Sequence, residues 1–235
     1  MSVHQRHQVY EADQVQFFDE LISQEWDSYK SESWDQTRRF EVKLLFKRVR
    51  PKTIMDIGCG CGFHDVEMAQ YPFVQRVDAI DPSSESIRKA EQYYPHSKVK
   101  RWVAGVSDLP SSTKYDLVVS YQVFEHLDCP EDYLAKCREI VADTGTVAII
   151  MPNGKRLRNR KLARKGLPPE LIDVMHFHEY TVDETAALAS RQGLKLNCSF
   201  GYHLEWGKFS HTTKLKLGSY FPSLANGIGV LLVKA

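Results

Sequence analysis

Three glycines at every second position are the residues whose type and spacing point most directly to ligand chemistry. Gly58, Gly60 and Gly62 follow a short apolar run near 53–57 that includes the acid Asp56. Glycine permits positive φ angles, and it lets a ligand approach main-chain N–H groups that a Cβ would shield. The pattern therefore predicts a strand that leads directly into a ligand-binding turn.

The glycine spacing distinguishes between cofactors. A dinucleotide-binding turn has the pattern G-x-G-x-x-G, which would require glycine at position 63, where this chain has Phe63. The third glycine is Gly62 instead, so the pattern is D-x-G-x-G-x-G beginning at Asp56. This order resembles motif I of the class I S-adenosylmethionine-dependent methyltransferases.

A second carboxylate supports the same hypothesis. Nineteen residues after Gly62, the next apolar run ends at Asp81. A carboxylate there can accept both hydrogen bonds of a ribose diol. Asp81 could instead cap the helix that begins near Ser83, and both roles can hold together. We favour the ribose role, and Asp78 is the poorer candidate because it lies further from the end of the strand.

The segment from Tyr115 to Leu127 resembles the fourth strand of that family and the E-H-L turn that follows it. The resemblance covers about residues 50–200 and is strongest to ubiquinone-biosynthesis and sugar-tailoring O-methyltransferases. It implies that S-adenosylmethionine is the cofactor. It also implies that main-chain groups around Tyr121 and Gln122 face the methionine end of that cofactor.

The resemblance leaves alternatives open at two charged residues. Asp56 would order the glycine turn, meet the cofactor's ammonium through water, or have a structural role alone. Arg38 or Arg39 would pair with the methionine carboxylate in the bidentate geometry that arginine allows, or lie solvated on the surface.

The adenine contact departs from the family pattern. Val106 stands where relatives often carry an aspartate, so either Asp108 or the main chain of Val106 and Ser107 would hold the ring. The complete set of expected cofactor-binding residues is Arg38, Asp56, Gly58, Cys59, Gly60, Gly62, Asp81, Pro82, Val106, Ser107, Tyr121 and Gln122.

Histidines are the candidate bases. Methyl transfer from a sulfonium mainly requires positioning and exclusion of water, and a base is needed only for a hydroxyl acceptor of high pKa. His126, His176 and His178 are the candidate bases, with His126 and His178 as the expected catalytic residues, although His126 is equally a structural partner of its turn. The pair His176 and His178 lacks a third nearby ligand, so we expect no metal site. Thr181 instead predicts a capping box.

Two segments are candidate substrate caps. Residues 155–165 carry seven basic residues among eleven, which is typical of a solvated helix face or, alternatively, of a site for an anionic acceptor. Residues 201–226 are rich in aromatic side chains and would close over an apolar acceptor, form a dimer surface or pack irregularly.

Composition sets independent bounds. With 235 residues and 43% hydrophobic content, the chain can bury one full core. A net charge of +1 gives no global field that demands nucleic acid or an anionic membrane, so any such contact must be local. No apolar run is long enough to span a bilayer, and we expect a cytoplasmic protein. The five cysteines predict neither disulfides nor a zinc site.

The order of elements predicts an α/β fold. Strands are expected near 53–57, 74–80, 98–103, 115–121, 145–151, 194–200 and 228–234, with helices near 63–71, 84–93, 131–142 and 182–192. This alternation predicts a Rossmann-like, seven-stranded, mostly parallel sheet with helices on both faces and the last strand antiparallel. We expect a single domain over 1–235, with a helical cap at 1–50, a core at 51–235, and cap insertions near 153–180 and 201–227.

The functional prediction follows. The chain is expected to transfer a methyl group from S-adenosylmethionine to a small-molecule acceptor, at a hydroxyl on an anionic or carrier-linked substrate. The alternatives are an RNA- or protein-directed methyltransferase and a non-catalytic S-adenosylmethionine-binding protein. Nucleic acid is not the expected partner because the chain is nearly neutral overall.

Overall fold

The computed structural model describes residues 14–23, 31–173 and 175–235. Seven strands form one sheet: β1 (Thr53–Ile57), β2 (Arg76–Asp81), β3 (Val99–Val103), β4 (Tyr115–Tyr121), β5 (Val141–Pro152), β6 (Leu194–Tyr202) and β7 (Gly227–Lys234). The α-helices with assigned bounds are α2 (Glu32–Phe46), α3 (Phe63–Ala69), α4 (Ser84–Tyr93), α5 (Pro130–Ile140), α6 (Leu157–Ala163), α7 (Val182–Arg191) and α8 (His211–Tyr220).

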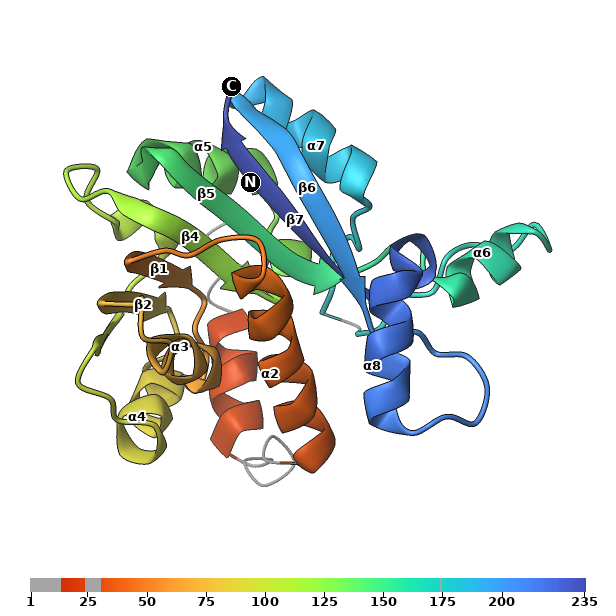
Figure 1. The fold of residues 1–235 in the computed structure, drawn as a ribbon, viewed down its shortest axis with the longest axis horizontal. Helices are drawn as coiled ribbons and strands as arrows, with labels where there is room; N and C mark the ends of the chain where they lie inside the picture. The colour runs from red at the N-terminus through yellow and green to blue at the C-terminus, as the bar shows by residue number, and fades with distance from the viewer. Residues whose placement is uncertain (1–13, 24–30, 174) are drawn as a thin grey trace.

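The sheet has the strand order β3-β2-β1-β4-β5-β7-β6 (Figure 1). The pairs from β3 through β5 are parallel, and β7 lies antiparallel between β5 and β6. The predicted fold is therefore confirmed, including the antiparallel last strand. The strand order reverses between β1 and β4, and the crevice outside the carboxyl ends of these strands is where such sheets bind ligands.

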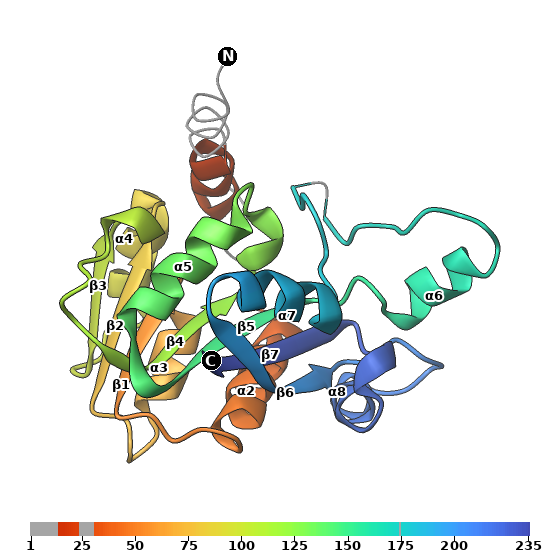
Figure 2. The ribbon, with the colours of Figure 1, turned by 90° about the horizontal axis from the view of Figure 1, so that it is seen from above.

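Helices cover both faces of the sheet (Figure 2). The apolar side chains of α5 and α7 pack with one face, and those of α2, α3 and α8 pack with the other. The central strands are buried on both sides, which explains why residues such as Leu117, Val118 and Val119 in β4 are apolar in succession rather than alternating with polar ones. Among the described residues, no helix combines the length and apolarity needed to cross a bilayer.

Two element boundaries differ from the sequence prediction. The helix expected near 131–142 ends at Ile140, and β5 begins at Val141 rather than near 145, because Val141 pairs with Tyr115 across a register shift in β4. A β-branched residue gains more from sheet pairing than from one more helical turn. The 201–227 insertion contains a helix that was not predicted, α8, which packs closely on β6 at Gly218.

A buried ion pair joins α3 to β3 beneath the glycine turn. Arg101 Nε donates to Asp65 Oδ2 at 2.7 Å, and both side chains are almost completely buried. The other guanidinium nitrogens donate to Glu91 and to the carbonyl oxygen of Tyr94. Burial raises the pKa of Asp65, and the attraction of Arg101 opposes that rise. This pair therefore keeps two charges in the core only because each satisfies the other.

Breaking this pair should strongly destabilise the fold. Arg101→Met leaves Asp65 buried without its cation, and we expect the free energy of unfolding to fall by about 3–5 kcal/mol in urea titration. The double variant with Asp65→Asn should recover part of this loss because it also removes the buried charge. A single variant within about 0.5 kcal/mol of the unmodified chain would contradict this account.

Candidate cofactor and acceptor site

The glycine turn is tied to the end of the neighbouring strand. The amides of Gly58 and Cys59 both donate to the carbonyl oxygen of Ile80, at 2.8 and 2.9 Å. The amide of Gly60 donates to Asp81 Oδ2 at 2.8 Å. All three glycines have positive φ angles, of 75°, 53° and 83° along the chain. The turn is therefore held in a conformation that only glycine adopts readily.

The surroundings of the glycines differ, and the difference locates the space for a ligand. A Cβ at Gly58 would lie 2.4 Å from Val123 Cγ2, and one at Gly62 would lie 2.7 Å from the Cβ of Ala90. A Cβ at Gly60 would meet no described atom within 4 Å. The outer glycines are thus required for packing, whereas the middle one faces open space beside Asp81. We call this space, at the carboxyl ends of β1, β2 and β4, the pocket.

Asp81 lies at the end of β2, next to that space. Its two oxygens accept the amides of Gly60 and Ser83, at 2.8 and 2.9 Å. Burial raises its pKa to about 6, and these two hydrogen bonds limit the rise. The alternative role of Asp81 as a helix cap is wrong, because Ser83 Oγ accepts the amide of Ser86 and caps α4. Each Asp81 oxygen retains a lone pair for a further donor.

Asp56 differs from the expectation. It accepts none of the amides of the glycine turn, which donate to the carbonyl oxygens of Ile80 and Cys59 and to Asp81, so the prediction that it orders the turn in this way is wrong. Both carboxylate oxygens are buried without a hydrogen-bond partner in the described part of the chain. Burial, followed by repulsion from Asp65 and Asp81, raises its pKa well above the ordinary value. A cationic ligand group would satisfy this site.

Arg38 lies over the first turn of α3. Its guanidinium carbon is 5.1 Å from the centre of the Phe63 ring and 5.6 Å from that of Trp34, and it also pairs with Asp35 at 3.4 Å. Arg39 is more exposed and lies 3.9 Å from Glu67. Of the two arginines, Arg38 is therefore placed beside the glycine turn.

The loop after β3 lies against the end of β2. The amide of Ala104 donates to the carbonyl oxygen of Asp81 at 3.1 Å, which brings residues 105–108 alongside the pocket. Asp108 Oδ2 accepts the amide of Gly105 at 2.8 Å within this loop. The carboxylate therefore already has a local partner, and this arrangement favours the main chain of Val106 and Ser107 as the contact to an adenine.

The end of β4 completes the pocket on the opposite side. Gln122 has a φ angle of 57°, a strained value for a residue other than glycine, and its amide donates to the carbonyl oxygen of Ile150. The Tyr121 side chain points into the core and stacks on His64 with 3.8 Å between ring centres. Only the main chain at this position is therefore available to a ligand.

A buried polar cluster beneath the pocket was not found by sequence reasoning. His64 Nε2 lies 2.8 Å from Glu41 Oε2, and Gln122 Nε2 donates to the Tyr202 hydroxyl at 3.0 Å. These residues come from α2, α3, the end of β4 and β6. No spacing in the sequence relates them, because the contacts exist only once α2 packs across the sheet.

The described part of the N-terminal helix, residues 14–23, spans the two sides of the pocket. Asp19 accepts a hydrogen bond from Ser83 Oγ and lies at the start of α4. The ring of Phe18 contacts His126 edge-on, with 5.5 Å between ring centres. The sequence places Phe17, Phe18, Leu21, Ile22 and Trp26 at helical spacing, and of these Trp26 lies outside the described residues.

His126 lies in the E-H-L turn after β4 and contacts Phe18. Burial, followed by the nearby His176, lowers its pKa to about 4, so the ring is neutral at pH 7. Its Nδ1 lies 3.1 Å from the carbonyl oxygen of Met175. A carbonyl can only accept, so Nδ1 carries the proton and Nε2 holds the lone pair. Nε2 is therefore the nitrogen that can accept a proton.

The structure brings His176, rather than His178, to His126. The rings of His126 and His176 lie 4.7 Å apart, whereas His178 is exposed and contacts Tyr180 and Glu184. Thr181 forms the predicted capping box with Glu184, at 2.8 and 3.2 Å.

Glu125 adds a buried carboxylate to the two neighbouring histidines. Its oxygens have no partner among the described residues, and burial raises its pKa to about 8. One ligand atom from each of Glu125, His126 and His176 lies within 4.8 Å of the others, so this is a group that could hold a metal ion. The expectation of no metal site stays a prediction.

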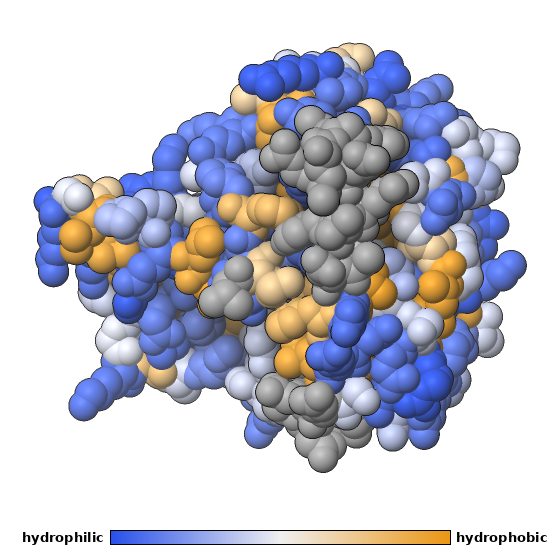
Figure 3. All heavy atoms as spheres, turned by 180° about the vertical axis from the view of Figure 1, so that it is seen from behind, coloured by the Kyte–Doolittle hydropathy of each residue, from blue (hydrophilic) through white to orange (hydrophobic). Residues whose placement is uncertain are grey.

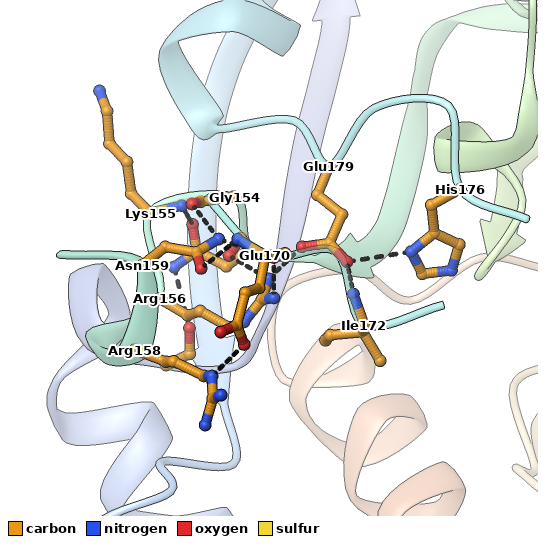
Figure 4. A network of polar contacts seen from close by, with 11 residues as sticks. Gly154, Lys155, Arg156, Arg158, Asn159, Glu170, Ile172, His176 and Glu179 are labelled. Carbon is orange, nitrogen blue, oxygen red and sulfur yellow. Dashed lines mark hydrogen bonds and ion pairs between the residues drawn. The ribbon is translucent and has the colours of Figure 1, made fainter. Parts of the chain in front are cut away.

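The first arginines of the basic run after β5 form ion pairs within the fold. Arg156 is buried and donates to Glu179 and to the carbonyl oxygen of Glu170, while Arg158 donates to the Glu170 carboxylate (Figure 4). Burial alone would raise the pKa of Glu179, but hydrogen bonds from His176, the amide of Ile172 and Arg156 outweigh it and lower the pKa. Arg156 and Arg158 therefore fix the segment in place.

Comparisons with known proteins agree with this geometry. The family model described as "Methyltransferase domain" matches residues 27–199. The ubiquinone biosynthesis O-methyltransferase of Candida albicans is 30% identical over 87 residues, 35% of this chain and 27% of that protein. The tRNA U34 carboxymethyltransferase of Shewanella putrefaciens is 29% identical over 134 residues, 54% and 37% of the respective chains.

A further relative is the malonyl-[acyl-carrier protein] O-methyltransferase of Halalkalibacterium halodurans. It is 30% identical over 114 residues, 44% of this chain and 42% of that protein. The matches thus span less than half the length of each of these curated relatives.

A solved structure shows the same fold over almost the whole chain. The magnesium protoporphyrin IX methyltransferase of Synechocystis PCC 6803, determined with bound SAH, has a TM-score of 0.67 at 14% identity and covers 96% of this chain and 100% of that one. The family match extends over most of the sheet and over the glycine turn, Asp81, the loop after β3 and the end of β4. The chain therefore belongs to the class I S-adenosylmethionine-dependent methyltransferases, with S-adenosylmethionine as its cofactor.

Proposed function

We propose that this protein transfers a methyl group from S-adenosylmethionine to a hydroxyl of a small-molecule acceptor. The observation that carries the proposal is the neutral His126 in the turn after β4, whose Nε2 has no hydrogen-bond partner among the described residues, together with the glycine turn that opens at Gly60. The bound cofactor supplies an activated methyl group on a sulfonium. The residues of the chain position it, exclude water and accept the acceptor's proton.

The proposed cofactor contacts follow from the geometry of the turn. The oxygens of Asp81 accept the ribose hydroxyls, and the space at Gly60 admits the nucleoside. Main-chain groups of Val106 and Ser107 hold the adenine. Cys59 and Pro82 shape the turn and the start of α4, beside the residues that make these contacts.

Charged groups near the start of α3 and at the end of β1 are proposed to hold the methionine end of the cofactor. The unpartnered carboxylate of Asp56 receives the ammonium, directly or through water. Arg38 pairs with the carboxylate from above the first turn of α3. The main chain of Tyr121 and Gln122 lies between these groups and the acceptor.

The proposed acceptor class follows from the relatives and from the overall charge of the chain. Among the relatives, one is named for an acyl-carrier-linked acceptor and another for a tRNA base, so carrier-linked and RNA acceptors are both represented. We favour a small molecule with an anionic or carrier-linked group, because one relative is named for an acyl-carrier-linked acceptor and the chain as a whole carries a charge of only +1, which gives no extended field for RNA. Turnover of S-adenosylmethionine to its demethylated product with a panel of hydroxyl acceptors tests this assignment. Transfer to tRNA alone would contradict it.

Removal of the Asp81 carboxylate should weaken cofactor binding. Asp81→Ala deletes a charged acceptor from a buried site, and we expect about 1–3 kcal/mol lower affinity for S-adenosylmethionine by titration calorimetry. Asp78→Asn is the matched control, since Asp78 bonds Tyr115 away from the pocket and its loss should leave the affinity unchanged. Equal effects of the two variants would remove Asp81 from the site.

The two ends of the glycine turn should respond differently to alanine. Gly60→Ala costs about 1–2 kcal/mol of stability from its positive φ and should abolish detectable cofactor binding, because the new methyl group occupies the ligand's space. Gly58→Ala drives a Cβ into Val123 and should lower the melting temperature much further. A folded Gly60→Ala protein that binds with normal affinity would show that the open space is not the cofactor's.

Loss of the proposed base should affect turnover but not cofactor affinity. His126→Gln should lower kcat by about 10²–10⁴-fold and leave the dissociation constant of S-adenosylmethionine unchanged. His178→Gln is the matched control and should retain full kcat, because His178 faces Glu184 and solvent. If His178→Gln were the variant that lost turnover, the base would be misassigned.

A further inference from the structure

One end of the molecule projects beyond the sheet. The segment that contains α6 extends away from the carboxyl end of β5, and α8 with the loop before it lies at the same end in both ribbon views (Figures 1 and 2). Buried Arg156 holds this segment in a fixed position through Glu179. The shape is therefore a rigid projection, which we call the α6–α8 end and define as residues 154–173 and 203–221.

The α6–α8 end carries exposed cations without an ion-pair partner, although Arg160 Nε donates to the carbonyl oxygen of Lys155 at 3.0 Å. Arg160, Lys161, Arg164 and Lys165 on and after α6 are exposed, as is Lys208 in the loop before α8, and none of them forms an ion pair among the residues that the structure describes. Residues 154–173 hold seven lysines and arginines against two acids, whereas the whole chain carries a net charge of only +1. The positive charge is therefore concentrated here.

Apolar side chains are exposed among these cations. Leu167, Leu171 and Ile172 are between 45% and 56% exposed, and Trp206 and Phe209 at the loop tip are 56% and 49% exposed. Figure 3 shows apolar residues on the projecting end among hydrophilic ones. A hollow of about 210 Å³ beside α6 combines both kinds of side chain, with Lys155 and Arg160 next to Ala163, Leu167 and Pro169.

We infer that the α6–α8 end docks on the surface of an anionic lipid bilayer. Cations next to exposed leucine, isoleucine, tryptophan and phenylalanine suit the boundary between headgroups and acyl chains, where the charges meet lipid phosphates and the apolar groups enter the hydrocarbon. Nucleic acid would use the cations but would leave the aliphatic side chains in water. The inference goes beyond methyl transfer and does not depend on it.

The α6–α8 end is connected through the chain to the turn that contains His126. The segment between α6 and α7 returns to the pocket, where the amide of Phe177 donates to the carbonyl oxygen of Glu125 at 2.9 Å, next to His126. A bilayer bound at α6 would thus lie at one end of the segment between α6 and α7, whose other end lies against Glu125 and His126. An acceptor dissolved in or anchored to that bilayer would reach the pocket from its surface.

Co-sedimentation of the purified full chain with vesicles tests the inference. The probe is vesicles of one part phosphatidylglycerol to three parts phosphatidylcholine, compared with phosphatidylcholine alone. We expect binding to the anionic vesicles that weakens with added salt. The triple variant Arg160→Glu, Lys161→Glu, Arg164→Glu should bind at least about 100-fold more weakly, since each cation near the surface contributes roughly a factor of five.

Two further variants make the test specific. Trp206→Ser with Phe209→Ser should weaken binding by at least about tenfold, because two large apolar groups no longer enter the bilayer. The matched control Lys47→Glu, Lys52→Glu, Lys100→Glu reverses three exposed cations near the start of β1 and on β3, and it should bind like the unmodified chain. All variants should keep the melting temperature and the affinity for S-adenosylmethionine.

Three results would overturn the inference. The first is absence of sedimentation with anionic vesicles. The second is an equal loss of vesicle binding in the control variant, which would show that binding depends on overall positive charge and not on the α6–α8 end. The third is retention of RNA on filters that the α6 triple variant abolishes while the Trp206 and Phe209 variant leaves it intact, with no vesicle binding.

Discussion

The fold of the cofactor site depends on close packing between the glycine turn after β1 and the elements on either side of it. Gly58 and Gly62 touch Val123 and Ala90 so closely that no side chain fits, and the amides of Gly58 and Cys59 share one carbonyl oxygen at the end of β2. This contact aligns the ends of β1, β2 and β4. It leaves the amide of Gly60 pointing at Asp81 and an open space beside it.

Buried charge beneath this turn is distributed unevenly. Asp65 is neutralised by Arg101, whereas Asp56 has no partner in the described part of the chain and holds a raised pKa. A protein that leaves a carboxylate unsatisfied in its core gives up stability. On the proposal that the cofactor's ammonium meets Asp56, ligand binding would offset this cost, and stability and ligand affinity would be linked at this residue.

The segment between β5 and α7 connects two sites of different chemistry. At one end His176 and Phe177 contact the E-H-L turn, and at the other α6 carries exposed cations. Arg156 and Glu179 between them form a buried pair that makes the segment rigid. The basic run consequently has two uses, since its first arginines stabilise the fold while the later cations remain available for a partner.

The sequence by itself determined the family, the mostly parallel α/β fold class and the glycine turn followed by Asp81, because these depend on local backbone conformation and on residues a fixed distance apart, whereas the strand order came from the structure. Tertiary structure alone decided that Asp56 has no partner, that Ser83 rather than Asp81 caps α4, and that His176 rather than His178 lies beside His126. It also decided which cations are exposed, and it placed α8 in a segment without a clear helical pattern. The reason is physical: burial and pairing depend on which distant elements pack together, and no spacing along the chain encodes that packing.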